Sequence, residues 1–345
     1  MQIFQNIFSL YHTPTPLKQT HSIPHSIIIC YNKTMDLAII VPVHNAEKYL
    51  PRCIKSLLGA TADINAKIIL LNDASTDNSW DIMSEYKRKY KDKLEIYNRP
   101  HSGAGAIRNY GTELANLDKA KYIWFVDADD TVSPDSAHKL LNKAKEKDAD
   151  LVMMRAKRIY QDGKTSYLSA VDESTEDYKS RFIRYGMGPW QVLIKRTWWE
   201  KHGFRFKEGI IQEDMELMSA LILYTDKFAS IDEPLYNYYE TPESVLHKKD
   251  FTPHVYDIFP ALTGLYERFK EAHAEQKYYS ELEWFFIWNL LIDSAKDFAK
   301  YPEAKSGYQK SREMLQKYFP HWRHNKFLRA KPLKLQLLVR LNYYK

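Results

Sequence analysis

The sequence contains few cysteines and no long hydrophobic run. Only Cys30 and Cys53 occur among its 345 residues, so a disulfide framework is excluded and a reducing compartment is expected. The longest apolar run, 284–292, is interrupted by Asn289 and is shorter than the roughly 18 to 20 residues of a membrane span. The amino terminus has no basic segment followed by a continuous apolar one, so no signal peptide is predicted.

Motifs that would define several other functions are also absent from the sequence. It has no glycine-rich phosphate loop of the Walker type and no Cys or His pairs at zinc-ligand spacing. Internal repeats are missing as well. The acidic stretch that begins at Asp127 is not an EF-hand loop, because Val132 stands at the glycine position and His138 at the closing glutamate position.

Acidic residues are rare at the carboxyl terminus. The formal net charge of +6 is modest, but between Ala304 and Lys345 the only acidic residue is Glu313. Leucines alternate with Lys and Arg after residue 331, which predicts a helix lying on an anionic membrane leaflet. A terminal helix packed on the main domain is the alternative.

The first part of the chain alternates strand and helix patterns. Residues 1–34 lack any periodicity, and Met35 stands directly before the first strong strand, so we predict a poorly packed, dispensable extension. Apolar, β-branched runs predict strands at 37–43, 67–71, 94–97 and 122–126. Strands that alternate with helices at this spacing predict an α/β fold with a mainly parallel central sheet.

The later part of the chain is less regular and then becomes helical. A helix over 134–147 is followed by a strand at 151–154, and two aromatic segments, 227–231 and 235–239, predict edge strands. From residue 251 the pattern stays helical. We therefore divide the sequence into the extension 1–34, a main domain 35–245 with halves 35–135 and 136–245, and a basic helical region 246–345.

An acidic cluster follows the most apolar strand. The run 122–126 ends in Asp127, Asp129 and Asp130, and open α/β sheets bind ligands at the carboxyl ends of such strands. Carboxylates this close raise one another's pKa unless a cation or donors neutralise them. Oxygen ligands suit Mg²⁺ or Mn²⁺, and the alternative is that these residues cap the next helix.

Five motifs, in order along the chain, resemble those of the family 2 glycosyltransferases, which are nucleotide-sugar enzymes with a GT-A (Rossmann-like) fold. They are Ile-Val-Pro-Val-His-Asn at 40–45, the polar loop 72–79, Arg-Asn-Tyr-Gly at 108–111, Asp-Ala-Asp-Asp at 127–130 and Glu-Asp at 213–214. The segments 190–196 and 203–206 also resemble the acceptor side of bacterial members. The resemblance covers about residues 36–245.

The resemblance implies a donor site made of Pro42, Asn45, Asp73, Arg108 and Asp127. Asp73 would accept a hydrogen bond from the nucleotide base, with uracil as the expected base, and Arg108 would meet phosphate or base with its planar donor fork. From chemistry alone, Asp73 is equally well an Asx-turn residue. For Arg108, a solvated helix residue is the alternative.

The resemblance also implies a metal site. Asp129, helped by Asp127 or Asp130, would hold the divalent cation that bridges the donor phosphates. His247 would supply a later ligand from the carboxyl-terminal side, and a surface histidine is the alternative.

The same resemblance implies the catalytic and acceptor residues. Asp214, next to Glu213, would be the general base that removes the proton of the acceptor hydroxyl, while the alternative is an ordinary carboxylate at a helix start. Trp190 would offer a flat apolar face to an acceptor sugar, or else belong to the core.

Two positions depart from the family pattern. Asn72 stands where Asp is frequent, and Ala74 replaces a frequent Gly, so we expect no positive φ at Ala74. Gly103 and Gly105 allow a close approach of the backbone to a ligand.

The expected function is inverting, metal-dependent transfer of a hexose from a UDP-sugar to a glycan hydroxyl in cell-surface polysaccharide synthesis, such as lipopolysaccharide or capsule. A cytoplasmic enzyme, peripheral on the inner membrane face and without a nucleic-acid partner, is expected. One alternative is a haloacid-dehalogenase-type phosphatase that uses Asp127 as nucleophile and Asp129 as acid/base. Another is a non-enzymatic module that binds lipid or nucleic acid.

Overall fold

Four parallel strands form the amino-terminal half of the sheet. The computed structural model describes residues 34–168, 170–171, 174, 177–241 and 250–345, so the predictions for 1–33 and for His247 lie outside the described residues. The parallel strands are β1 (Leu37–Val43), β2 (Ala66–Asp73), β3 (Leu94–Arg99) and β4 (Tyr122–Phe125), in the order β3-β2-β1-β4. The predicted positions of these strands are confirmed.

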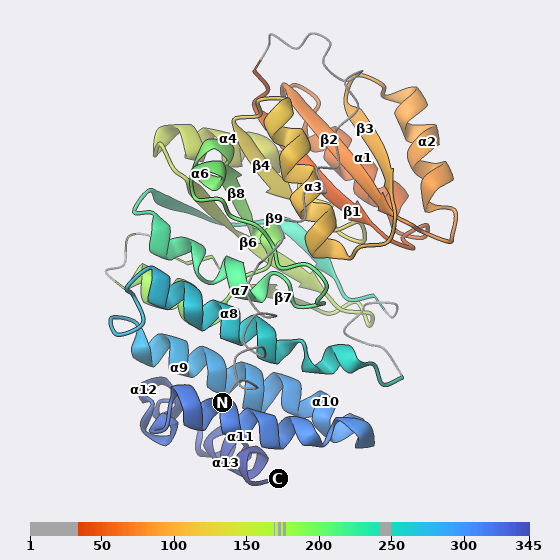
Figure 1. Ribbon diagram of the computed structural model, residues 1–345. Coiled ribbons are helices and arrows are strands. Elements are labelled where there is room, and N and C mark those ends of the chain that lie inside the picture. Colours follow the sequence, from red (N-terminus) through yellow and green to blue (C-terminus); the bar gives the residue numbers. More distant parts are fainter. Residues whose placement is uncertain (1–33, 169, 172–173, 175–176, 242–249) are drawn as a thin grey trace, which may run out of the picture. The chain divides into compact units, whose positions relative to one another are not determined.

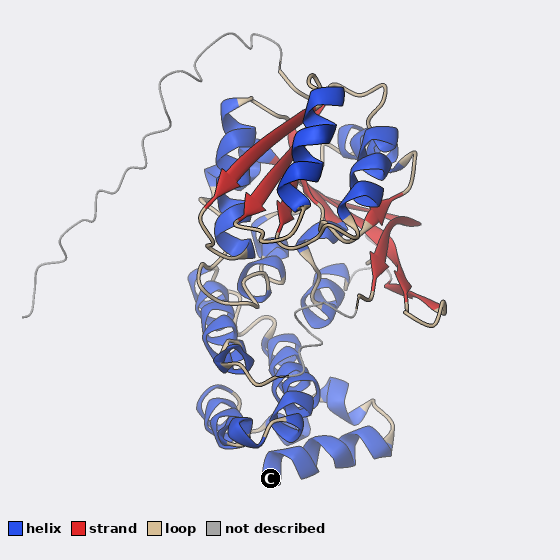
Figure 2. Ribbon diagram, turned by 90° about the vertical axis from the view of Figure 1, so that its right-hand side faces the viewer, coloured by secondary structure: helices blue, strands red, loops and turns tan. Residues whose placement is uncertain are grey.

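Both faces of these strands are covered by helices, as Figure 2 shows. Side chains of β1 alternate between two buried clusters: Leu37, Ile39 and Val41 belong to one, and Ala38 and Ile40 to the other. The first cluster includes residues of α1 (Leu50–Ala60), α2 (Ser79–Lys89) and α4 (Ser136–Glu146), and the second includes residues of α3 (Ala104–Leu117). A strand buried on both faces has few polar residues, which is why it was recognisable in the sequence.

The second half of the sheet is mixed. Its strands are β5 (Thr131–Val132), β6 (Leu151–Ile159), β7 (Thr165–Leu168), β8 (Val192–Lys195) and β9 (Phe228–Tyr239). The order continues β4-β8-β6-β9-β5, with β8 antiparallel to β4 and β6, and β7 pairs with β6. The prediction of an α/β fold with a mainly parallel sheet is thereby confirmed.

The prediction of two separate edge strands at 227–231 and 235–239 is wrong. They are the two ends of β9, which lies between β6, its parallel partner, and the short β5. The register between β6 and β9 shifts on either side of Arg155, which pairs with Pro234. Proline cannot donate to a strand ladder, so the sequence suggested a break where the strand contains an irregularity.

Three short helices lie between the later strands, and further helices follow the last strand, as Figure 1 shows. Between β7 and β9 lie α5 (Tyr178–Tyr185), α6 (Arg196–Lys201) and α7 (Met215–Met218). The carboxyl-terminal helices are α8 (Ile258–Glu271), α9 (Tyr279–Trp288), α10 (Ser294–Lys300), α11 (Ser306–Tyr318), α12 (Lys326–Arg329) and α13 (Leu333–Tyr344). None of the helices within the described ranges is long and apolar enough to cross a membrane.

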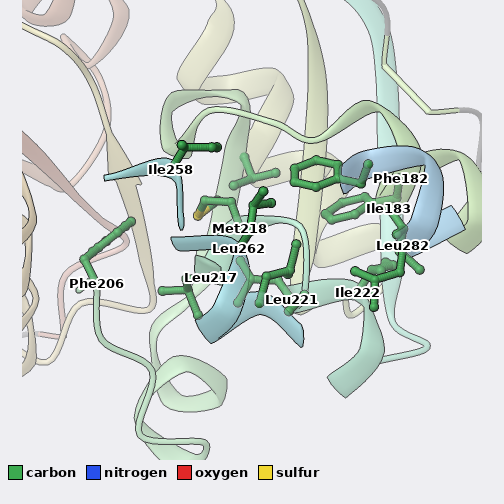
Figure 3. Close-up of a cluster of buried hydrophobic side chains, with 14 of the residues drawn as sticks. Phe182, Ile183, Phe206, Leu217, Met218, Leu221, Ile222, Ile258, Leu262 and Leu282 are labelled. Carbon is green, nitrogen blue, oxygen red and sulfur yellow. The ribbon is translucent and has the colours of Figure 1, made fainter. Parts of the chain in front are cut away.

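One hydrophobic cluster joins the helical region to the sheet. Figure 3 shows side chains from α5, α7, α8 and α9 packed together, among them Phe182, Met218, Leu262 and Leu282. The same cluster continues to Ile40 and other residues of the sheet. The division at residue 246 therefore stays a prediction, since buried contacts run across it.

Candidate active site

The candidate functional residues lie in loops at one edge of the sheet. Because β1 to β4 are parallel, their carboxyl ends meet at the same edge, and the strand order reverses between β1 and β4. Open α/β sheets bind their ligands at such a switch point. Asp73 ends β2, and the loops after β1, β3 and β4 contain Asn45, His101 and the acidic run 127–130.

Arg108 joins two acidic groups that are far apart in the sequence. Its guanidinium donates from Nη2 to Asp127 Oδ1 over 2.9 Å and from Nη1 to Glu213 Oε1. The residue is 6% exposed, so the alternative of a solvated helix residue is excluded. Burial alone would lower the pKa of Arg108, but Asp127, Glu213 and Asp214 raise it above its ordinary value, and the guanidinium stays charged. The end of β4 and the segment before α7 are thereby linked through α3.

The other residues of the Arg-Asn-Tyr-Gly motif fix α3 in place. Asn109 donates from Nδ2 to the Phe206 carbonyl over 3.0 Å and accepts from the Phe206 N–H over 2.8 Å. A Cβ on Gly111 would lie 2.3 Å from Ile40 Cγ2, and one on Gly105 would lie 2.5 Å from the Lys207 carbonyl oxygen. Gly105 thus allows close approach of another chain segment. The sequence had suggested a ligand at this position.

Glu213 and Asp214 are acids in a low-dielectric environment. Burial raises the pKa of Glu213, although Arg108 opposes the shift. Burial also raises the pKa of Asp214, with Arg108 again opposing. Asp214 occupies the N-cap position of α7 but its side chain makes no capping hydrogen bond. The backbone N–H groups of Asp214 and Met215 favour its charged form and oppose the effect of burial, and its role as general base stays a prediction.

The three carboxylates after β4 have different partners. Asp130 is fully buried and accepts from Tyr236 Oη over 2.7 Å and from the Tyr239 N–H over 2.8 Å. Burial raises the pKa of Asp130 well above its usual range. Its oxygens are committed to β9, so the structure does not support the suggestion that Asp130 helps to bind metal.

Asp129 and Asp127 remain as candidate cation ligands. Asp129 accepts one long hydrogen bond, 3.3 Å from Thr241 Oγ1. Burial and then the charge of Asp127 raise the pKa of Asp129 to about 6. Asp127 uses one oxygen for Arg108, and its side chain is 29% exposed. Neither residue caps α4, whose N-cap position is occupied by Asp135.

Asp73 organises the neighbouring loop. Its Oδ1 accepts from the Ser102 N–H over 2.7 Å and its Oδ2 from the Gly103 N–H over 3.0 Å. His101 Nδ1 lies 3.0 Å from the same Oδ2. This loop carries Gly103 at φ +84. Binding of a nucleotide base by Asp73 stays a prediction, and the base would share an already occupied carboxylate.

The loops after β1 and β2 are tied to each other. Asn45 accepts from the Thr76 N–H over 2.8 Å, and its own N–H donates to Ser75 Oγ over 3.0 Å. The expectation for Ala74 is wrong, because this residue has φ +52. Left-handed backbone costs a non-glycine residue only about 1 to 2 kcal/mol, and the bond from the Ser75 N–H to the Asn72 side chain holds the turn. Pro42 lies within β1, and its contact with a donor stays a prediction.

Trp190 is almost covered by aromatic neighbours. It is 8% exposed and stacks on Tyr236 and Tyr238, with ring centroids 4.6 and 5.5 Å away. A Cβ on Gly188 would lie 2.4 Å from its Nε1. This packing favours the core alternative, and acceptor contact by Trp190 stays a prediction.

The sequence did not point to two features of this edge. His44, Asp73 and His101 each offer a ligand atom, and these atoms lie within 4.8 Å of one another, a spacing that a metal ion could occupy. Each residue ends or follows one of three neighbouring parallel strands, which is the signal that would have grouped them. Gln212 Oε1 is buried and accepts no hydrogen bond from the described residues, so it has acceptor capacity beside Glu213.

The model of glycosyl transferase family 2 matches residues 38–203. The chain carries a family 2 glycosyltransferase domain. The matched residues include the loops after β1 to β4 and the whole Arg-Asn-Tyr-Gly motif. The phosphatase alternative is accordingly set aside. Asp127, which it would use as nucleophile, follows the fourth strand of the domain.

Curated relatives agree with this family. The putative glycosyltransferase EpsH of Bacillus subtilis (strain 168) is 27% identical over 275 residues, which cover 75% of this chain and 76% of EpsH. The poly(ribitol-phosphate) beta-glucosyltransferase of Bacillus spizizenii is 29% identical over 207 residues, or 59% of this chain and 32% of that protein.

Solved structures show the same fold. The structure of S. aureus TarS 1–349 in complex with UDP-GlcNAc has a TM-score of 0.71 at 18% identity, and covers 90% of this chain and 89% of that chain. GalNAc-T7 with UDP, GalNAc and Mn²⁺ has a TM-score of 0.51 at 15% identity, covering 84% of this chain and 59% of that chain. The GT-A fold, with helices after it, is therefore confirmed.

Proposed function

We propose that this glycosyltransferase is an inverting enzyme that transfers a hexose from a UDP-sugar to a hydroxyl group of a glycan acceptor. The observation that carries the proposal is the double ion pair of Arg108. It connects Asp127, beside the candidate donor site, with Glu213, beside the candidate base Asp214. A donor-binding group and a proton acceptor must lie close together in a single-displacement reaction, and this arrangement supports that requirement.

The donor residues of the proposal lie at the carboxyl ends of β1, β2 and β4, in the loops after β1 and β4, and in α3. Asp73 would accept from the N–H of uracil, with Asn45 and Pro42 shaping the loop, while Arg108 and Asp127 would face the phosphates. The complex of the structural neighbour TarS with UDP-GlcNAc supports a UDP-sugar donor. Positioning matters here because a bound, oriented donor lowers the entropic barrier to attack.

The acidic residues fit a divalent cation. Asp129 and the second oxygen of Asp127 are carboxylate donors of the kind that bind Mg²⁺ or Mn²⁺ together with substrate phosphates. Burial and the charge of Asp127 raise the pKa of Asp129 to about 6, so a cation bound here would stabilise its ionised form. When bound, the cation would supply charge that stabilises the leaving diphosphate. The Mn²⁺ in the GalNAc-T7 structure supports this choice.

Asp214 would act as general base in one displacement. The acceptor oxygen forms a bond to the anomeric carbon while the bond from that carbon to the phosphate oxygen breaks, and UDP leaves with the bonding electrons. The acceptor proton passes to the Asp214 carboxylate. An α-linked donor then gives a β-glycoside, and the name of the beta-glucosyltransferase relative supports this outcome.

The acceptor would be a glycan of the cell surface, free or linked to lipid. Relatives named for poly(ribitol-phosphate) and for minor teichoic acid synthesis support this class. Lipopolysaccharide or capsule synthesis is the context we propose. The enzyme would act in the cytoplasm, at the inner face of the membrane.

The experiment that tests the proposal is incubation with a panel of sugar nucleotides and with glycan acceptors of the teichoic acid and capsule types. We expect one UDP-sugar to be turned over, with UDP released. The anomeric proton coupling in the NMR spectrum of the product should show a β-linkage from an α-donor. An α-product would contradict the inverting role of Asp214.

A further inference from the structure

One face of the last helix, α13, is buried against the protein, and on the other side Tyr344 Oη accepts a hydrogen bond from Arg323 over 2.9 Å. Val339 is fully buried and Tyr343 is 5% exposed. Asn342 Nδ2 donates to the Leu291 carbonyl over 2.9 Å, and Arg312 Nη1 donates to the Tyr343 carbonyl over 3.0 Å. Figure 1 shows α13 at the carboxyl-terminal end of the chain, where it contacts α11. This face of α13 therefore packs on the carboxyl-terminal helical region, and packing on the main domain, the alternative given above, stays a prediction.

The opposite face of α13 is apolar and exposed. Leu333, Leu337, Leu341 and Tyr344, here named the leucine face, are 70%, 49%, 64% and 69% exposed. At about 100° per residue they lie within about 80° of one another and opposite Val339. A helix that is apolar all round is normally buried, and apolar side chains grouped on a surface mark an interaction site. We therefore expect the leucine face to be an interaction surface.

Positive charge surrounds the leucine face. Lys334, Arg340 and Lys345 on and after α13 are exposed, with Arg340 on one side of the leucines and Lys334 on the other. From Met314 to Lys345 the sequence contains eight Lys and Arg residues and no Asp or Glu. A second copy of this surface would bring like charges together. A soluble polyanion would match the charge but leave the leucines exposed.

We propose that α13 docks on a bilayer of anionic phospholipid, with the leucine face in the acyl-chain boundary and the flanking Lys and Arg on the lipid phosphates. A helix with leucines flanked by basic residues lies in the plane of such an interface. The long side chains of Lys and Arg can reach the lipid headgroups while the neighbouring leucines lie in the acyl-chain boundary. The proposal rests on α13 alone and goes beyond the proposed sugar transfer, which does not require it.

The test is co-sedimentation of the full chain with vesicles of phosphatidylglycerol or of phosphatidylcholine, at low and high salt. We expect binding to phosphatidylglycerol vesicles that weakens as salt rises, because exposed charges are screened. Lys334→Gln with Arg340→Gln should weaken binding about 25-fold, since each basic residue near an anionic surface contributes about 1 kcal/mol, or about 5-fold. Leu337→Asn with Leu341→Asn should weaken it at least about ten-fold, since immersed leucines contribute apolar burial.

Matched controls keep the test specific. Leu117→Asn changes a leucine that is 52% exposed on α3, and Lys91→Gln with Lys145→Gln removes two exposed charges elsewhere. These variants should bind vesicles like the wild type, and all variants should keep the wild-type thermal midpoint and UDP affinity.

Several outcomes would overturn the proposal. They are no vesicle binding, equal binding to phosphatidylcholine, or binding that survives both α13 double substitutions. A dimer in light scattering that the leucine substitutions dissociate, without vesicle binding, would assign the leucine face to a second copy. Binding to polyphosphate that depends on the lysines but not on the leucines would assign the charge to a soluble polyanion.

Discussion

Asp73 and Asp129 both follow parallel strands at the same edge of the sheet, yet their surroundings differ. Asp73 accepts backbone hydrogen bonds from Ser102 and Gly103. Asp129 accepts only a 3.3 Å bond from Thr241 among the side-chain bonds of the described residues, and its pKa rises to about 6. A carboxylate with enough donors shapes a loop, whereas a buried one without them favours an external cation. We therefore expect Asp129 to depend on a bound cation for its charge balance, whereas the loop donors already balance the charge of Asp73.

The same contrast is repeated over a single residue step. Asp130 directs both oxygens to β9, through Tyr236 and the Tyr239 N–H, while the Asp129 carboxylate accepts a long bond from Thr241 Oγ1. The residue type alone therefore does not assign a role to each aspartate of the acidic run. Substitutions to asparagine keep the shape of each side chain and remove its charge, so they test this contrast directly.

Asp129→Asn should abolish donor turnover while the protein stays folded. Removal of the charge eliminates the principal cation ligand that we propose, and chelation of the wild type should have the same effect. Because the carboxylate is ionised at a cost in its buried site, the thermal midpoint should not fall. Turnover of the sugar nucleotide, measured by released UDP with and without EDTA, checks the prediction.

The control for this prediction is addition of Mg²⁺ or Mn²⁺ in excess after chelation. Activity of the wild type should return and that of the variant should not. Full activity of the wild type in EDTA would remove the metal role of Asp129 and Asp127.

Much of this edge could be predicted because buried parallel strands leave a simple pattern. The runs at 37–43 and 122–126 are apolar on both faces, and the residues that follow them must lie at the carboxyl edge. The parallel half of the sheet and the acidic cluster followed from that rule. Strand β9 was predicted as two strands because Pro234 interrupts the run of strand-forming residues. In the structure, pairing with β6 continues on both sides of Pro234.

The partners of each site residue could not be predicted, because they come from distant segments. The residues next to Arg108 in the sequence do not indicate that it contacts Glu213. Glu213 lies in a segment that Asn109 holds by a hydrogen bond to Phe206, and that can approach α3 closely because Gly105 has no side chain. The occupation of Asp73 by the 101–103 loop is hidden for the same reason. Ala74 shows a further limit, since side-chain bonds around the turn stabilise a backbone region that its residue type disfavours.

Asp214→Asn should lower turnover about 10² to 10⁴-fold, the usual contribution of general base catalysis. UDP affinity should stay at the wild-type value, because the side chain faces the acceptor in our proposal. Steady-state rates and calorimetric titration with UDP separate the two effects. Asn has nearly the shape of Asp, so the thermal midpoint should stay at the wild-type value, and a changed midpoint would reveal a folding defect. A parallel loss of UDP binding would place Asp214 in the donor site instead.

Asp73→Ala should weaken UDP binding about ten- to hundred-fold, because hydrogen bonds to a charged group contribute about 1.5 to 3 kcal/mol. The substitution removes the acceptor for the base and also frees the Ser102 and Gly103 N–H groups. Calorimetric titration with UDP measures the affinity of this variant, which is compared with that of Asp214→Asn. Wild-type UDP affinity in Asp73→Ala would show that the carboxylate serves the loop alone.

Turnover should fall as pH is lowered, starting above the ordinary pKa of an aspartate. Burial raises the pKa of Asp214 from its usual 3.8, and only the ionised form accepts a proton. The pH dependence of kcat between pH 4.5 and 8 checks this, with one proton bound per active site as the pH is lowered through the acidic limb. In Asp214→Asn the contribution of Asp214 to the limb should disappear, and the fall that remains would come from protonation of Asp129, whose pKa is about 6. A wild-type kcat that is constant down to pH 4.5 would exclude a base with a raised pKa.

Asp130→Asn should leave turnover close to that of the wild type, unlike the adjacent Asp129→Asn. Burial raises the pKa of Asp130 in the folded protein, so its contribution to stability is complete below the unfolded pKa and is lost as pH rises through the folded value. Asparagine cannot ionise, and it still offers an oxygen to the Tyr239 N–H and an amide to Tyr236. The thermal midpoint of the variant, relative to the wild type, should therefore increase from pH 5 to pH 8, as scanning calorimetry would measure. A difference in midpoint that does not change with pH would show that Asp130 is ionised throughout, and turnover lost to the same degree as in Asp129→Asn would return Asp130 to the candidate cation ligands.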